Sequence, residues 1–207
     1  MYELNQAVPF PDQGEMTSTK AAILDAAITS VKREGWARVT LGDIARQAGV
    51  TRPTVYSYFS NRDEVVRAAL LQSAYAFGAR LMEHLALFPT DAERVTEAVL
   101  YSLRVLPDEP CLALITDPEL TPLVNAHTLT TPEGLGMGTA VFRMMLPGRE
   151  HSDDEMEEMA EFSIRFMISL LTMSGPRARD EAALRGFIQR RLLPGLGLAP
   201  GQEEGQK

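Results

Sequence analysis

Five hydrogen-bonding side chains are concentrated in one short stretch, RPTVYSY, at Arg52, Thr54, Tyr56, Ser57 and Tyr58. A guanidinium group can fork onto a guanine edge or hold a phosphate, and hydroxyl groups can donate to phosphate oxygens. If the stretch is helical, this face suits a nucleic acid better than it suits water. The residue types therefore predict contacts with DNA.

The preceding segment, TLGDIARQAGV, has the pattern of a short helix that would position this stretch. Its apolar residues Leu41, Ile44, Ala45 and Ala48 recur at helical spacing, so one side of the helix is expected to be buried. Gly49 follows at the point where a helix end favours a left-handed residue. Two helices joined by a tight turn form a helix-turn-helix, which places its second helix in the major groove of DNA.

The second helix is expected to begin after the cap Thr51, with Pro53 in its first turn, where a missing N–H is tolerated. Arg52 and Thr54 lie at the end of the helix from which side chains reach base edges. For Arg52 a phosphate contact is an equally good interpretation. The Thr54 methyl group is expected to meet a thymine methyl group.

The remaining contacts are expected to fix the position of the helix on DNA. Tyr56 and Tyr58 would donate to phosphates, with partial burial against the following helix as the alternative for Tyr58. Thr40 begins the first helix of the pair and suits a phosphate, an ordinary N-cap, or both. Arg62 is expected to clamp a phosphate. The complete predicted DNA-binding set is Thr40, Arg52, Pro53, Thr54, Tyr56, Ser57, Tyr58 and Arg62.

The segment from about Thr17 to Val66 resembles the DNA-binding domain of the TetR family of bacterial regulators. The resemblance rests on a leading helix AAILDAAITSVKREGW, then VTLGDIARQAGV, then TRPTVYSYFSNRDEVV. It implies an all-α protein of about nine helices, with an N-terminal three-helix DNA-binding domain and a C-terminal helical ligand-binding and dimerisation domain. It also implies a homodimer that binds a pseudo-palindromic double-stranded DNA operator, with repression as the default.

The distribution of charge agrees with a DNA-binding head. The whole chain has a net charge of −8, which alone argues against a nucleic-acid partner. Residues 17–62 nevertheless hold seven basic and three acidic side chains, a local charge of +4, so the other residues carry −12. A basic head on an acidic body is expected if only the head meets phosphate.

Composition excludes several other classes of protein. The 207 residues are 45% hydrophobic, and no apolar run approaches the roughly 18 residues that span a bilayer. The N-terminus lacks the basic and apolar regions of a signal peptide. Cys111 is the only cysteine, which excludes an internal disulfide and fits a reducing cytoplasm. A buried inert thiol is its expected role, with a redox-sensing thiol as the alternative.

The rest of the chain also has helical periodicity. Helices are expected at 18–34, 61–88, 91–106, 131–146, 152–174 and 180–193, with prolines or glycines at several ends. Trp36 is expected to plug the small three-helix core. The predicted domains are a flexible arm at 1–16, the DNA-binding head at 17–62, an effector-binding and dimerisation body at 63–193, and a disordered tail at 194–207.

The last two long helices are expected to form the dimer interface, because each carries apolar residues at three- and four-residue spacing. Packing of these residues within one subunit is the alternative. The predicted interface residues are Met159, Phe162, Phe166, Leu170, Leu184, Phe187 and Ile188.

A helical body attached to a DNA-binding head suggests control by a small effector. Ten methionines are many for this length, and methionine lines adaptable apolar pockets. We therefore expect an apolar effector, although ordinary core packing is the better interpretation for any single residue. The candidate pocket residues are Phe77, Leu81, Tyr101, Phe142, Met145 and Phe166.

No pattern of residues predicts catalysis, a metal site or a cofactor. The glycine run from Gly134 to Gly138 follows no strand and lacks dinucleotide-site spacing, so a loop or flexible helix is expected. His84, His127 and His151 have no paired ligand spacing. Two alternatives to a ligand-responsive repressor remain: a small-molecule-binding or enzymatic helical protein with a vestigial head, and a structural DNA-binding protein with a fully packed body.

Overall fold

The computed structural model describes residues 18–35, 38–109, 132–148, 151–173, 175 and 177–199. These residues form α-helices and two short 3-10 turns: α1 Ser18–Glu34, α2 Leu41–Gln47, α3 Arg52–Tyr58, α4 Arg62–Leu85, α5 Asp91–Val105, η1 Leu106–Asp108, α7 Pro132–Met145, α8 Asp153–Thr172, α9 Glu181–Arg191 and η3 Leu193–Leu196. The described part of the chain contains no strand, which confirms the all-α prediction. The predicted roles of Trp36, Cys111 and His127 lie outside the described residues.

Side-chain caps explain where most helices begin. The hydroxyl groups of Thr40, Thr90 and Ser152 each accept a hydrogen bond from the backbone N–H three residues later, and the acidic side chain at that position bonds back to the cap N–H. Thr51 and Asn61 cap α3 and α4 in the simpler one-way manner. Each such cap typically stabilises a helix by about 1 kcal/mol. The predicted starts of these five helices are therefore confirmed.

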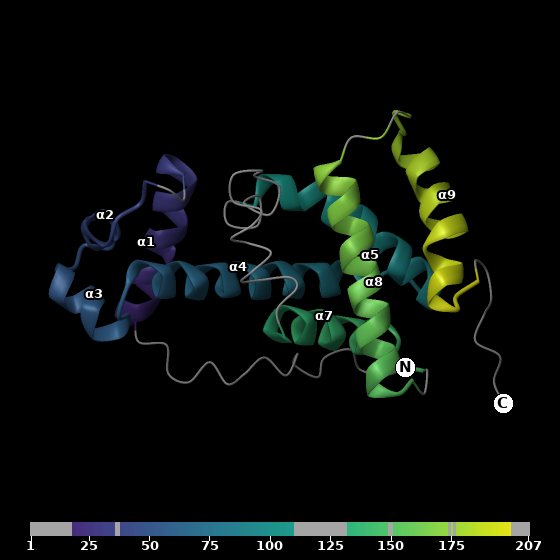
Figure 1. The fold of residues 1–207 in the computed structure, drawn as a ribbon, viewed down its shortest axis with the longest axis horizontal. Helices are drawn as coiled ribbons and strands as arrows, with labels where there is room; N and C mark the ends of the chain where they lie inside the picture. The colour runs from purple at the N-terminus through teal and green to yellow at the C-terminus, as the bar shows by residue number, and fades with distance from the viewer. Residues whose placement is uncertain are drawn as a thin grey trace.

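Two large hydrophobic cores divide the described part of the molecule into a head and a body. The head core holds α1, α2 and α3 against the first half of α4, around residues such as Ile23, Ile44 and Val55. The body core holds α5, α7, α8 and α9 against the second half of α4. In Figure 1 the head lies at one end of the long α4 and the body at the other.

Helix α4 is the one described helix that contributes to both cores. Val65 and Val66 are fully buried in the head, and Leu81 and Leu85 are buried in the body. With 24 residues, α4 extends about 36 Å. One continuous helix therefore joins the head core to the body core.

The structure differs from the sequence prediction at helix ends. Helix α4 ends at Leu85 rather than near Phe88. Pro107 and Pro194 lie inside the 3-10 turns η1 and η3, where each occupies an early position that needs no N–H donor. The segment 194–199, which was predicted to begin a disordered tail, instead buries Leu196 and Leu198 in the body core.

The glycine run belongs to helix α7. A Cβ atom at Gly138 would come within 2.7 Å of Ile164 Cδ1, so the absence of a side chain lets α7 approach α8 closely. Both helices border the same apolar cavity in the body. The glycine run is therefore a packing feature of the body. No helix in the described ranges is long and apolar enough to cross a membrane.

Candidate nucleic-acid interface and apolar cavity

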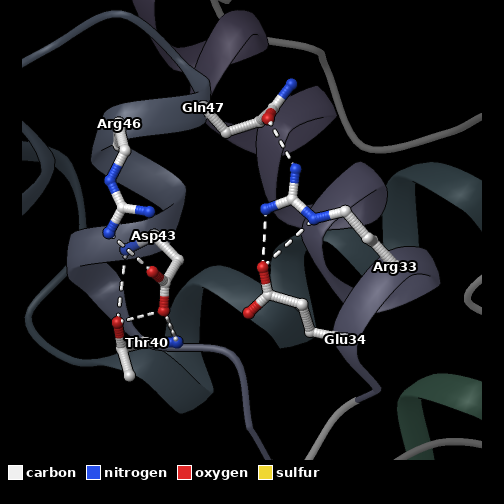
Figure 2. Close-up of polar contacts among 6 residues, drawn as sticks. All are labelled: Arg33, Glu34, Thr40, Asp43, Arg46 and Gln47. Atoms are coloured by element: carbon white, nitrogen blue, oxygen red, sulfur yellow. Dashed lines mark hydrogen bonds and ion pairs between the residues drawn. The ribbon is translucent and has the colours of Figure 1, made fainter.

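The first turn of α2 is locked by Thr40 and Asp43 (Figure 2). The Thr40 hydroxyl donates to Asp43 Oδ2 at 2.5 Å, and the Thr40 N–H donates to the same oxygen at 3.1 Å. Arg46 donates to Asp43 Oδ1 at 2.8 Å. The hydrogen bond from the Thr40 hydroxyl holds the pKa of Asp43 below its ordinary value, and Arg46 adds to this effect. Thr40 is thus an N-cap whose hydroxyl and N–H are already engaged.

A second polar contact joins α1 to α2. Arg33 Nη1 donates to Gln47 Oε1 at 3.3 Å, while its Nη2 pairs with Glu34 at 2.6 Å (Figure 2). The link fixes the last turn of α1 beside the last turn of α2. Gly49, with φ of +68°, then reverses the chain toward α3, as the sequence predicted.

Helix α3 presents most of its predicted contact residues to solvent. Arg52, Pro53 and Ser57 are exposed, and the Tyr56 side chain is 57% exposed. Tyr58 departs from this arrangement because it is partly buried against the head core, to which the following helix α4 also contributes.

Two hydroxyl groups on α3 already have local partners. The Thr54 hydroxyl lies 2.8 Å from the Thr51 hydroxyl, and Ser57 donates to the Thr54 carbonyl oxygen at 2.7 Å. These bonds stabilise the short helix. They also leave Tyr56 and Arg52 as the more accessible groups on this face.

A basic concavity of about 490 Å³ lies between the start of α2 and the side of α3. Arg38, Arg52 and Arg62 line it together with Tyr56. A methyl group at Gly42 would collide with the Arg52 guanidinium, so Arg52 lies back over the first turn of α2. The structure therefore brings together four predicted residues, Thr40, Arg52, Tyr56 and Arg62, and it adds Arg38, which the sequence analysis counted only as part of the basic head.

An apolar cavity of about 170 Å³ lies in the body between α4, α5, α7 and α8. Four of the six predicted pocket residues line it: Phe77, Leu81, Phe142 and Met145. Further lining residues that the prediction missed include Met137, Ser163, Ile164 and Met167. Among the described lining residues the only polar side chains are two serines, and none is charged.

Two predicted pocket residues lie elsewhere because aromatic partners hold them. Tyr101 stacks on His84, with ring centroids 4.8 Å apart. Phe166 stacks on Phe187 of α9 at 5.7 Å, so it joins α8 to α9 instead of facing the cavity. Neither residue belongs to the cavity lining.

A buried carboxylate connects three helices of the body. Glu97 of α5 is 5% exposed, and it pairs with His84 of α4 at 3.3 Å and with Arg185 of α9. The mostly buried Arg94 makes a similar link at the start of α5, because its Nε donates to the Met145 carbonyl oxygen at 2.6 Å. These contacts anchor helices that surround the cavity.

The predicted interface residues on α8 and α9 separate into three groups by burial. Met159 and Ile188 are buried in the core of their own subunit, which agrees with the alternative of packing within one subunit. Phe162 is 43% exposed despite its size. The others are partly buried: Phe166, Leu170, Leu184 and Phe187.

Comparisons with known proteins agree with this architecture. Residues 23–69 match the model for bacterial regulatory proteins of the tetR family. An uncharacterised HTH-type transcriptional regulator of Mycobacterium tuberculosis is 28% identical over 174 residues, which cover 83% of this chain and 82% of that protein. The HTH-type transcriptional regulator TtgR of Pseudomonas putida is 46% identical over 56 residues, 27% of each chain.

A solved structure shows the same fold over most of the chain. The TetR family repressor AlkX of Dietzia sp. has a TM-score of 0.64 at 23% identity, and the match covers 89% of this chain and 98% of that one. The family match coincides with the three-helix head, and the structural match extends through the body. Residues 23–69 therefore belong to the tetR family of bacterial regulatory proteins, and the chain is a transcriptional regulator with the fold of a TetR family repressor.

Proposed function

We propose that this regulator is a ligand-responsive repressor. In this account it binds a pseudo-palindromic operator in the cytoplasm as a dimer and is released by a small apolar effector. The observation that carries the proposal is the apolar cavity bordered by α4, the same helix that is packed into the DNA-binding head. Repression, rather than activation, is carried over from the family.

The cavity supplies a physical route from effector to DNA. Phe77 and Leu81 of α4 line the cavity, and Val65 and Val66 of the same helix are buried in the head. An effector that fits better when α4 is displaced would change the separation of the two heads in a dimer. Such an effector must bind one arrangement more tightly than the other, because equal affinity shifts no equilibrium.

The basic concavity is the proposed phosphate-binding part of the interface. Arg38, Arg52 and Arg62 supply positive charge, and the exposed Tyr56 supplies a hydroxyl group. The position of Arg52 over α2 favours a phosphate contact over the guanine contact. Thr40 acts by positioning α2, since its own donors are engaged by Asp43.

Among the remaining α3 residues, we propose that Thr54 reads base edges directly. Pro53 and Ser57 are exposed on the same helix and would contact the groove wall. Tyr58 would support α3 from the head core.

The proposed dimer interface is the outer face of α8 and α9. The exposed ring of Phe162 and the partly buried pair Phe166 and Phe187 lie on these helices. Two helices from each subunit would then form a four-helix interface around a two-fold axis. The dimer is needed because one recognition helix contacts only one half-site.

The cavity also bears on the alternatives. A structural DNA-binding protein without an effector predicted a fully packed body, and an apolar cavity of about 170 Å³ disfavours it. A vestigial head is disfavoured by the exposed Tyr56 and the adjacent basic concavity. We accordingly propose residues 17–62 as the DNA-binding unit and 63–193 as the effector and dimerisation unit.

Fluorescence anisotropy on DNA from upstream of the protein's own gene tests the proposal. Wild type is expected to bind it saturably in the presence of competitor DNA, and 1-alkanols or long-chain acyl compounds are expected to release it. Tyr56→Ala is expected to lose specific binding while remaining dimeric. Leu87→Ala is the control, because Leu87 is 75% exposed and lies just beyond the body end of α4. Equal binding by wild type and Tyr56→Ala would contradict the proposed interface.

A further inference from the structure

One hydroxyl group in the apolar cavity lacks a hydrogen-bond partner. Ser163 of α8 is 7% exposed and lines the cavity, and its Oγ atom bonds to none of the described residues. Three other buried hydroxyl groups of the body behave differently. Ser102, Thr96 and Thr139 each donate to the carbonyl oxygen four residues earlier, at 2.6, 2.7 and 2.9 Å.

This difference matters because back-bonding is the usual way for a helical serine to satisfy its hydroxyl group. A buried polar group without a partner is unfavourable, so it is expected to take a partner from whatever fills the space beside it. Ser102 lines the same cavity but already donates to Ala98. Ser163 is thus the distinctive polar group that the cavity offers a ligand.

The rest of the lining restricts the charge of that ligand. The described lining residues include neither a basic nor an acidic side chain. A carboxylate or ammonium group in such surroundings would lose its hydration without gaining a charged partner. The part of the ligand inside the cavity must therefore be uncharged.

The volume of the cavity restricts the size of the part of the ligand that it can enclose. A cavity of about 170 Å³ is close to the roughly 150 Å³ of an apolar cavity that binds benzene. This corresponds to a group of about six carbon atoms. Met137, Met145 and Met167 line the cavity and can change rotamer, so a somewhat longer chain can be accommodated.

We propose that the effector is an uncharged lipophilic molecule with one hydrogen-bonding oxygen, which the Ser163 hydroxyl group binds. A medium-chain alcohol, aldehyde or ketone has this chemistry. The inference rests on the proposed function, since it assigns an anchor within the same effector cavity. Ser163 determines specificity: it selects an oxygenated molecule over the hydrocarbon of the same shape.

Isothermal titration calorimetry on the full-length protein tests the anchor. The probes are 1-hexanol, n-hexane and hexanoate at pH 7.5, each titrated into wild type, Ser163→Ala and Ser102→Ala. Ser102→Ala is the matched control, because it removes a hydroxyl group from the same cavity that is already bonded to the backbone. Comparing variants for each probe cancels the different hydration of the probes. Ser163→Ala is expected to fold, since alanine favours helices and no protein bond is lost.

The expected result is a crossed effect. Ser163→Ala should weaken the binding of 1-hexanol about fivefold, which corresponds to one net hydrogen bond. The same substitution should leave the affinity for n-hexane unchanged or slightly higher. Ser102→Ala should alter neither by as much as twofold. Hexanoate should bind more weakly than 1-hexanol to all three proteins.

Three results would overturn the inference, and they separate it from the proposed function. If Ser163→Ala lost the same affinity for 1-hexanol as for n-hexane, or lost affinity for neither, Ser163 would not be the anchor, but an apolar effector site would remain. Tighter binding of hexanoate than of 1-hexanol would refute the uncharged class. Failure of every probe to bind wild type would refute the apolar effector site itself, and with it the anchor.

Discussion

Replacing Arg38 should change how strongly operator binding depends on salt. Arg38, Arg52 and Arg62 line one basic concavity per head, so a dimer would place six arginines against phosphates. The logarithm of affinity falls with the logarithm of salt concentration by about 0.9 per phosphate neutralised, which gives a slope of about −5.4. Arg38→Gln removes two contacts per dimer and should reduce the slope to about −3.6.

The consequence is large enough to measure by anisotropy on a fixed operator. Between 50 and 200 mM salt, wild type should lose about 2,000-fold in affinity and Arg38→Gln about 150-fold. Arg143→Gln is the control, because it removes the same charge from α7 of the body, where Arg143 pairs with Asp153. Phosphate contacts outside the concavity would change the slopes of wild type and Arg38→Gln by the same amount, so the difference between the two slopes would remain. An Arg38→Gln slope equal to that of wild type and Arg143→Gln would refute the assignment of the concavity to phosphate.

Three further perturbations test the head, the body and the interface. The pKa of Asp43 is lowered in the folded state, chiefly by Thr40, so its stabilising contribution is present above the ordinary value of 3.8 and is lost as the pH falls through the lower folded value. Asp43→Asn should therefore lose less thermal stability on acidification below about pH 4 than wild type does, and an identical loss in calorimetry would contradict this. Arg185→Met leaves the buried Glu97 carboxylate without its guanidinium partner and should lower the free energy of unfolding by about 2 kcal/mol, less than for a fully buried pair because Arg185 is 38% exposed. Urea unfolding measures the change, and Glu97→Gln combined with Arg185→Met should recover part of it. Phe162→Asp should yield a folded monomer in analytical ultracentrifugation, and a stable dimer would exclude Phe162 from the interface.

Helix starts were predictable from sequence because they depend on local side-chain chemistry. Thr40, Thr90 and Ser152 are each followed three residues later by an acidic residue, and all three pairs form reciprocal caps. Helix ends were less predictable because they depend on tertiary packing. Leu196 illustrates this: glycines and prolines surround it in sequence, yet the body core provides a site that buries it.

The cavity could be anticipated only in part. Apolar residues with helical spacing point inward, but spacing does not distinguish a residue that lines a space from one that fills it. Tyr101 and Phe166 were expected in the cavity, and aromatic stacking on His84 and Phe187 places them elsewhere. Ser163 had a detectable signal, since it lies four residues after Met159 on the buried side of α8. A polar residue on an apolar face is the pattern that would have identified it.

Filling the cavity tests the central claim, that an effector bound in the body controls the head through α4. Gly78 of α4 lines the cavity and Gly136 of α7 is exposed, and a Cβ atom at either position meets no other atom within 4 Å. Gly78→Leu would fill the cavity, and Gly136→Leu is the matched control. The measurement is the ratio of operator dissociation constants with and without 1-alkanols of six to twelve carbons.

The account predicts that the alkanol weakens operator binding by about tenfold or more in wild type and Gly136→Leu, within the usual range of allosteric coupling. In Gly78→Leu the ratio should be close to one, because the effector no longer has a site. An equal ratio in all three proteins would contradict the account, since release would then not depend on the cavity beside α4.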